Sequence, residues 1–250
     1  MASPPLLIKI IGGYIMQGFL GEFLGTMVLI VFGVGCGAGN SLKKTYAHGS
    51  NWTFVSLAWG LAVTFGVYVA ATFGSDGHLN PAVTLGFAAF GFFPWSQVGG
   101  YLLGQFLGAF VGALIVMVQY YPHFKAAKTP EDGNNVGIFA TGPAIPNPLF
   151  NFLSETIATF FFVFTLLNLG DFTKGLKPLI VGLLIVVVGQ TLGGTTGFAI
   201  NPARDFSPRL AYAVMPVPNK SDANWGYAWV PICGPIAGGL LAGFLQFLLV

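Results

Sequence analysis

The chain has 250 residues, of which 54% are hydrophobic and 7% are charged, and its formal net charge is +2. Soluble domains carry about 25% charged residues, so this composition excludes an ordinary water-soluble protein and indicates a chain solvated mostly by lipid. The small net charge, without any basic run in the sequence, also argues against a nucleic-acid partner.

Six segments are apolar and long enough to cross a hydrocarbon core of about 30 Å, which takes about 20 helical residues. Because backbone polar groups in lipid need partners within their own segment, each of the six is predicted to be a helix. They are residues 14–36, 52–73, 95–118, 150–170, 177–194 and 226–249. The sequence therefore predicts an all-α membrane protein, with residues 1–250 forming a single transmembrane domain.

Two shorter apolar segments, Pro81–Phe93 and Pro202–Val214, lie between these spans. A helix of about a dozen residues is about 18 Å long, so neither could cross a bilayer alone, whereas two that met end to end could complete one crossing. Both begin in the same motif, which is Asn80-Pro81-Ala82 in one case and Asn201-Pro202-Ala203 in the other. Asparagine is a favoured N-cap and proline suits the first helical position, so both motifs predict helix starts.

The two halves of the chain, about residues 10–120 and 145–250, are similar to each other. Phe19-Leu20-Gly21-Glu22 resembles Phe152-Leu153-Ser154-Glu155, and the Asn-Pro-Ala motifs occupy matching places. Since each half holds three spans, the second copy is inverted relative to the first, and such repeats place a functional site near the bilayer midplane. The short helices would then point their N-termini, each carrying about +0.5 charge, at one another and repel cations.

Glu22 and Glu155 lie inside predicted spans, where carboxylates are costly and usually functional. We expect each to accept hydrogen bonds from free backbone N–H groups in the loop before a short helix. A proton relay is the alternative.

Small residues recur every four positions in two spans, a spacing that lets membrane helices approach closely. They are Gly100, Gly104, Gly108 and Gly112 in the third span, and Gly234, Gly238 and Ala242 in the sixth. Close helix–helix packing is therefore predicted in both halves.

The sequence contains no nucleophile motif, metal-ligand cluster or phosphate-binding loop, so an enzyme is disfavoured and neither a cofactor nor a metal is expected. Cys36 and Cys233 are too few for a disulfide framework or a metal site. Both lie in apolar segments and are expected to be buried, inert thiols.

The extended motifs, His78-Leu79-Asn80-Pro81-Ala82-Val83-Thr84 and Gly197-Phe198-Ala199-Ile200-Asn201-Pro202-Ala203-Arg204-Asp205, resemble those of the major intrinsic proteins, the superfamily of aquaporins and aquaglyceroporins. The resemblance covers nearly the whole chain. It implies an aquaporin-like bundle of six spans and two re-entrant half-helices, a homotetramer with one pore per subunit, and a plasma-membrane location with both termini in the cytoplasm. The positive-inside rule would not select that orientation, because Lys43, Lys44, Lys125 and Lys128 would lie outside. The short tails favour a bacterial cell membrane.

The resemblance also implies which residues form the site. The family's aromatic/arginine filter corresponds to Trp59, Gly189, Phe198 and Arg204. Gly189 stands where water-selective relatives usually carry histidine and would leave room for Phe198. Asp205, which follows the arginine, is typical of the glycerol-facilitating branch and is expected to have a supporting role. The non-helical backbone before each motif is expected to line a watery path and to offer carbonyl groups to solute hydroxyls, at Gly77, His78, Gly197 and Ala199.

Together these features predict a passive channel for glycerol, water and other small uncharged solutes that excludes protons and ions. As is generally stated of aquaporin-type pores, selectivity would come from pore width, lining hydrogen-bond groups and electrostatic barriers. Urea, dihydroxyacetone, hydrogen peroxide and protonated small acids are further candidate solutes. Two alternatives stay open: a water-selective aquaporin, and a coupled secondary transporter, which would need ion-coordinating acids at the midplane.

Overall fold

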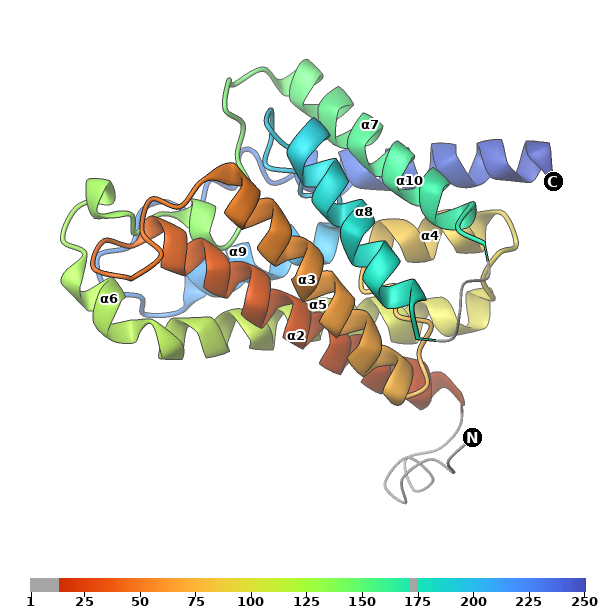
Figure 1. Cartoon of the computed structure of the whole chain (residues 1–250), viewed down its shortest axis with the longest axis horizontal. Coiled ribbons are helices and arrows are strands. Elements are labelled where there is room, and N and C mark those ends of the chain that lie inside the picture. Colours follow the sequence, from red (N-terminus) through yellow and green to blue (C-terminus); the bar gives the residue numbers. More distant parts are fainter. Residues whose placement is uncertain (1–13, 171–174) are drawn as a thin grey trace.

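The computed structural model describes residues 14–170 and 175–250, and within them every regular element is a helix (Figure 1). Residues 10–13 of the first predicted repeat lie outside this part of the chain. The α-helices are α2 (Tyr14–Ser41), α3 (Trp52–Thr72), α4 (Pro81–Ala89), α5 (Trp95–Gln119), α6 (Tyr121–Ala126), α7 (Pro148–Leu167), α8 (Lys177–Leu192), α9 (Pro202–Val214) and α10 (Val230–Leu249). Two short 3₁₀ turns, η1 (Pro130–Asp132) and η2 (Val136–Ile138), lie between α6 and α7.

All six predicted spans are helical, which confirms the predicted all-α class. Five of them, α2, α3, α5, α7 and α10, are long and apolar enough to cross a membrane. The sixth, α8, has 16 residues and is about 24 Å long. Several ends were predicted wrongly. α2 continues to Ser41 and α10 begins only at Val230. α4 ends at Ala89 instead of Phe93, because Gly91 adopts a φ of +83° that a helix cannot accommodate.

Asparagine side chains fix the starts of four helices. In each case the side-chain oxygen accepts a backbone N–H of the first turn, which satisfies a donor that has no partner inside the helix. A proline occupies the first or second helical position in three of them, α4, α7 and α9. The capping residues are Asn51 for α3, Asn80 for α4, Asn147 for α7 and Asn201 for α9.

The predicted glycine stripes bring helices into close contact in both halves. α2 packs along α5, and α7 packs along α10. A Cβ atom at Gly104 would lie 2.6 Å from the carbonyl oxygen of Phe19, and one at Gly238 would lie 2.8 Å from the backbone nitrogen of Phe160. Only residues without a side chain allow such an approach, so the prediction of close packing is confirmed.

The two halves also interlock. α3 of the first half packs against α8 of the second, α4 packs against α10, and α9 packs against α5 (Figure 1). Each short helix therefore lies against a long helix of the other half. This crosswise packing brings the starts of α4 and α9 to the centre of the bundle.

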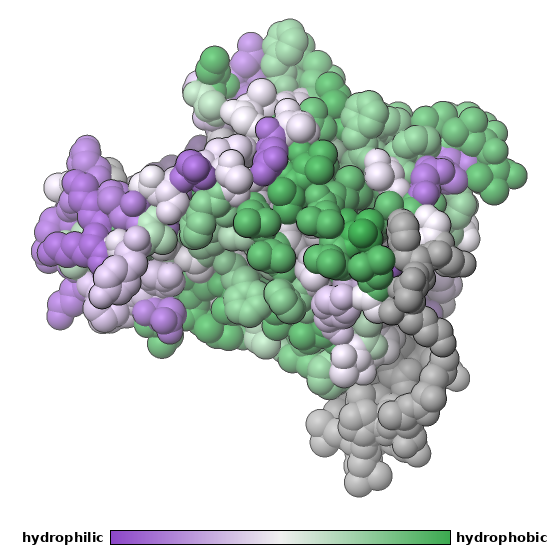
Figure 2. All heavy atoms as spheres, viewed as in Figure 1, coloured by the Kyte–Doolittle hydropathy of each residue, from purple (hydrophilic) through white to green (hydrophobic). Residues whose placement is uncertain are grey.

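The outer surface of the bundle is apolar. Figure 2 shows hydrophobic side chains across the helices, and hydrophilic ones gathered at the end that holds α6 and its loops. Large exposed apolar side chains occur on α3, α5, α7, α8 and α10, among them Phe65, Leu103, Phe161, Val187 and Leu241. Cys36 is only half-buried and Cys233 is exposed on this surface, so the prediction of buried thiols is wrong for Cys233.

Candidate functional site

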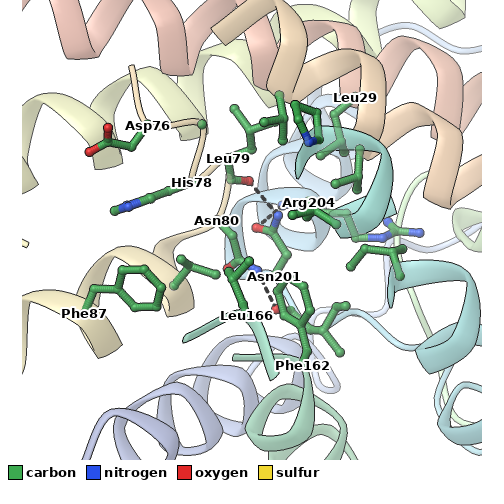
Figure 3. Close-up of a pocket in the computed structure, with 18 of the residues that line it drawn as sticks. Leu29, Asp76, His78, Leu79, Asn80, Phe87, Phe162, Leu166, Asn201 and Arg204 are labelled. Atoms are coloured by element: carbon green, nitrogen blue, oxygen red, sulfur yellow. Dashed lines mark hydrogen bonds between the residues drawn. The ribbon is translucent and has the colours of Figure 1, made fainter. Parts of the chain in front are cut away.

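The two short helices meet at their N-termini (Figure 3). Asn80 Nδ2 donates to the carbonyl oxygen of Ile200 at 2.8 Å, and Asn201 Nδ2 donates to the carbonyl oxygen of Leu79 at 2.7 Å. The Oδ1 atom of each asparagine accepts the backbone N–H two residues later, which caps its own helix. Each asparagine therefore joins its own helix to the loop of the other half, and the predicted end-to-end arrangement is confirmed.

The loops before these helices have unusual backbone conformations. Leu79, Phe198 and Ile200 have φ angles of +51°, +41° and +44°. Residues with side chains rarely adopt this left-handed region, and such strain persists only where the surroundings hold it in place. The turns aim the carbonyl groups of Leu79 and Ile200 at the asparagine side chains.

Two buried carboxylates hold these loops. Each accepts hydrogen bonds from the two backbone N–H groups that precede a motif asparagine. For Glu22 these are His78 and Leu79, at 2.9 and 2.7 Å, and for Glu155 they are Ala199 and Ile200, at 3.0 and 2.8 Å. Neither glutamate has exposed surface. The matching contacts reproduce the sequence similarity of the two halves in three dimensions.

The first half has an additional polar network that the sequence analysis did not identify. Glu22 also accepts from Ser75 Oγ at 2.5 Å and from Gln105 Nε2 at 2.6 Å. Gln105 Nε2 also donates to Thr84 Oγ1 at 2.9 Å, and its side chain is fully buried in α5. The sequence did carry a signal for this network, because Gln105 lies in the middle of an apolar span and a buried amide needs hydrogen-bond partners.

A cavity of about 610 Å³ runs past the two asparagines. One wall is a stripe along α3 with a residue every four positions: Trp59, Val63, Val67 and Ala71. Apolar side chains of α7 and α8, Phe162, Leu166, Val181 and Ile185, continue this wall. The polar lining comes from the loops and the starts of the short helices. In Figure 3, Asn80 and Asn201 lie side by side, with Arg204 on one side of them and His78 and Asp76 on the other.

One end of the cavity combines a cation with two aromatic rings. Trp59, Phe198 and Arg204 all line it. The Arg204 Cζ atom lies 3.8 Å from the centroid of the Trp59 ring, a favourable cation–π position. Arg204 Nη1 donates to the carbonyl oxygen of Phe139 at 3.0 Å, which orients the guanidinium, and the residue is only 8% exposed.

Gly189 contributes space rather than a lining group. A Cβ atom there would lie 2.8 Å from Phe198 Cζ, so the phenylalanine ring rests directly on the Gly189 backbone. Trp52, which the sequence analysis did not single out, donates from Nε1 to the Gly189 carbonyl oxygen at 2.8 Å.

Of the described backbone positions assigned as solute acceptors, Gly77, His78 and Ala199 line the cavity, whereas Gly197 does not. Gly197 faces Thr141 instead, where an added Cβ would lie 3.4 Å from the threonine side chain. Its φ of +84° turns the chain into the loop before α9.

Asp205 is the partner of Arg209, not of the neighbouring Arg204. Arg209 donates to Asp205 Oδ1 from Nε at 2.9 Å and from Nη2 at 2.7 Å, and both side chains are fully buried. Asp205 Oδ2 accepts the backbone N–H and hydroxyl of Thr141 at 2.6 and 2.8 Å. Arg209 also donates to the carbonyl oxygens of Ala223 and Asn224. This pair therefore ties α9 to the loop before α7, at Thr141, and to the loop after α9, at Ala223 and Asn224.

The other end of the cavity has charged residues at its rim. Asp76 and Lys177 line it and are both exposed. The His78 ring, by contrast, is packed among Phe87, Phe93 and Tyr101, with centroids 5.3, 4.6 and 5.0 Å away. In the described part of the chain no group of three histidine, cysteine or acidic side chains could hold a metal ion.

Taken together, the cavity lining combines donors from Asn80, Asn201 and Arg204 with apolar side chains of α3, α7 and α8. Each asparagine amide carries two N–H donors, of which the bonds described above use one. The positive ends of α4 and α9 and the Arg204 guanidinium all face this passage and disfavour cations in it. Such a lining suits small neutral molecules that carry hydroxyl groups.

Comparisons with known proteins agree with this geometry. A family model described as Major intrinsic protein matches residues 13–246. Glycerol uptake facilitator protein 2 of Lactiplantibacillus plantarum is 77% identical over 231 residues, which cover 92% of this chain and 98% of the relative. The glycerol uptake facilitator protein of Bacillus subtilis is 49% identical over 230 residues, covering 91% and 83%. The X-ray structure of the aquaglyceroporin from Plasmodium falciparum is similar with a TM-score of 0.80 and 32% identity, covering 93% of this chain and 96% of that one.

Proposed function

The chain belongs to the major intrinsic protein family, and from that premise we propose that it is a passive channel through which glycerol and water cross the cell membrane. The resemblance inferred from the motifs and the aquaporin-like bundle are both confirmed. The relatives named as glycerol uptake facilitators support glycerol as a solute. A protein of this kind is a transport protein and not an enzyme.

The observation that carries the proposal is that Arg204, Trp59 and Phe198 all line the cavity, with the Arg204 Cζ atom 3.8 Å from the centroid of the Trp59 ring. Glycerol has hydroxyl groups along one edge and C–H groups along the other. In our proposal Arg204 donates to the hydroxyls while the two rings contact the hydrocarbon edge, so these three residues form the selectivity filter. Gly189 is its fourth member, because its missing side chain leaves the space that the Phe198 ring occupies.

Besides the selectivity filter, we propose a second constriction where the two Asn-Pro-Ala motifs meet. The remaining amide N–H of Asn80 and of Asn201 would donate to passing oxygen atoms. The positive ends of α4 and α9 also meet there, and these helices start with Pro81 and Ala82 and with Pro202 and Ala203. These dipoles, together with Arg204, raise the electrostatic free energy of a cation or a hydrated proton in the passage.

The loops supply the acceptors of the path. The backbone at Gly77, His78 and Ala199 lines the cavity and would accept hydrogen bonds from solute hydroxyls. Glu22, Glu155 and Asp205 would serve as structural supports, since all three carboxylates hold backbone N–H groups near the passage. We assign them no part in proton transfer.

Several finer features belong to the same proposal. We expect the whole chain to be one channel domain built from two inverted repeats, and the crosswise packing of the halves supports this. The apolar outer faces suit both lipid and neighbouring subunits of a homotetramer. We place the protein in a bacterial plasma membrane with both termini in the cytoplasm. Urea, dihydroxyacetone, hydrogen peroxide and protonated small acids are further expected solutes.

Glycerol uptake into proteoliposomes without any ion gradient tests the proposal. We expect glycerol to equilibrate faster than in protein-free vesicles, without accumulating above the outside concentration, and no proton flux to accompany it. Water flux without glycerol flux would identify a water-selective channel instead. Accumulation driven by an imposed sodium or proton gradient would identify a coupled transporter.

A further inference from the structure

The Phe198 ring is held closely on the side of α8. A Cβ atom at Gly189 would lie 2.8 Å from Phe198 Cζ, and one at Gly193 would lie 2.5 Å from Phe198 Cδ1. Carbon atoms in ordinary contact are about 3.5–4.0 Å apart, so the ring rests directly on glycine backbone. The Phe198 backbone is in the left-handed region, with a φ of +41°, and such a conformation persists only where the surrounding residues hold it.

Trp52 contacts the same ring and the same glycine. Its indole lies edge-to-face with Phe198, with ring centroids 5.6 Å apart and planes at 81°. Its Nε1–H donates to the Gly189 carbonyl oxygen at 2.8 Å. Gly189 lies in the last turn of α8, where carbonyl groups lack partners inside the helix, so this bond satisfies one of them.

Trp52 is itself well anchored as the first residue of α3. Asn51 caps this helix by accepting the Phe54 N–H at 3.0 Å, and Ser56 Oγ donates to the Trp52 carbonyl oxygen at 2.9 Å. One indole ring thus connects the start of α3, in the first half of the chain, with the end of α8 and the loop before α9 in the second.

We propose that Trp52 is a positioning residue that holds the Phe198 ring against Gly189 and thereby limits the size of solute that the filter admits. Trp52 is not among the described residues that line the cavity. It therefore acts through Phe198 and does not contact solute in the cavity. This inference rests on the filter assignment proposed above. It adds a residue outside the four positions of that filter.

Two variants separate the contributions of the ring and the N–H group. Trp52→Phe keeps an aromatic face and removes the bond to Gly189, whereas Trp52→Ala removes both. The readout is the permeability ratio of xylitol, a bulkier polyol, to glycerol, measured in proteoliposomes by stopped-flow light scattering. We expect this ratio to rise about fivefold in Trp52→Ala, which loses both the aromatic pair with Phe198 and the hydrogen bond to Gly189. In Trp52→Phe, which loses only the hydrogen bond, we expect a rise of about twofold.

Trp95→Ala is the matched control, since Trp95 is also the first residue of its helix, α5, and is 62% exposed. Its permeability ratio should equal that of the unmodified protein. Phe198→Ala serves as the reference for the filter itself and should raise the ratio at least as much as Trp52→Ala.

The outcomes distinguish the two proposals. A raised ratio in Phe198→Ala with an unchanged ratio in both Trp52 variants would overturn the positioning role and leave the filter intact. An unchanged ratio in Phe198→Ala would overturn the filter assignment. An equal loss of glycerol and xylitol flux in the Trp52 variants would also overturn the inference, because it would mean that Trp52 supports assembly alone. If Trp52→Ala does not assemble, Trp52→Phe decides by the same ratio.

Discussion

Replacing Gly189 with alanine should lower glycerol permeability much more than water permeability. The new Cβ atom would lie 2.8 Å from Cζ and 3.0 Å from Cε2 of Phe198, and 3.0 Å from the Cβ of Ser56. Since carbon contacts relax to about 3.5–4.0 Å, the Phe198 ring must move by about 0.5–1 Å. Ser56 belongs to α3, so α8 cannot retreat in that direction. The ring therefore yields into the cavity that it lines.

The size of the effect follows from the cost of overpacking, which is about 1–3 kcal/mol in a well-filled site. If this cost falls on the passage of glycerol, which fills the filter, permeability drops about 5- to 150-fold, since 1.36 kcal/mol corresponds to about tenfold. Water is smaller and should lose much less. Histidine at this position should have a stronger effect in the same direction.

Stopped-flow light scattering on proteoliposomes measures both permeabilities in one preparation. Gly35→Ala is the control, because a Cβ atom at Gly35 would meet nothing within 4 Å. A glycerol-to-water ratio that is the same in Gly189→Ala as in Gly35→Ala would refute the reasoning about the filter.

Three further predictions concern stability, measured as thermal unfolding of the purified protein in detergent. Glu155→Gln should cost about 1–3 kcal/mol, because an amide NH₂ group cannot accept the second backbone N–H of its loop; a large proton current in proteoliposomes would contradict the supporting role. Arg209→Met should cost about 3–5 kcal/mol by leaving a buried carboxylate without its cation, whereas Lys43→Met, which breaks an exposed ion pair, should cost less than about 1 kcal/mol. Equal unfolding midpoints for these two variants would contradict the larger stabilising effect that we assign to the buried pair of Asp205 and Arg209. Gly108→Ala should cost about 1–3 kcal/mol by pushing α5 off the α2 backbone. Gly99→Ala, in the same helix but with nothing within 4 Å of the new Cβ, should not lower stability, since alanine favours a helix more than glycine does. A Gly108→Ala variant as stable as Gly99→Ala would argue against tight packing.

The centre of the molecule was predictable because two independent signals coincide there. A capping asparagine followed by proline starts a helix by local physics, and its repetition in inverted halves implies that two such starts meet. Glu22 and Glu155 follow from the same repetition, since a carboxylate in an apolar span needs donors. The end of α4 was not predictable in this way. Phe90, Phe92 and Phe93 continue the apolar pattern, and only the left-handed conformation of Gly91 ends the helix.

Other parts of the site depend on contacts between segments far apart in the chain. Trp52 contacts Gly189 across 137 positions, and Arg204 bonds to the Phe139 carbonyl across 65. No local pattern marks a tryptophan at a helix start as a partner of a distant glycine. The pairing of Asp205 with Arg209 could have been predicted from the sequence, because residues four apart on a helix lie next to each other. The adjacent Arg204 obscured it in the sequence.

The most direct test of permeation through this cavity is chemical block at one of its walls. Val63 lines the cavity on α3, and Leu61, two residues earlier on the same helix, is 40% exposed on the outer surface. Val63→Cys proteoliposomes should lose most glycerol flux after treatment with a small thiol reagent. Leu61→Cys and the unmodified protein, whose own Cys36 and Cys233 are not among the cavity-lining residues described, should keep it. Full modification of the cysteine at position 63, verified by mass spectrometry, with glycerol flux unchanged would contradict passage through this cavity.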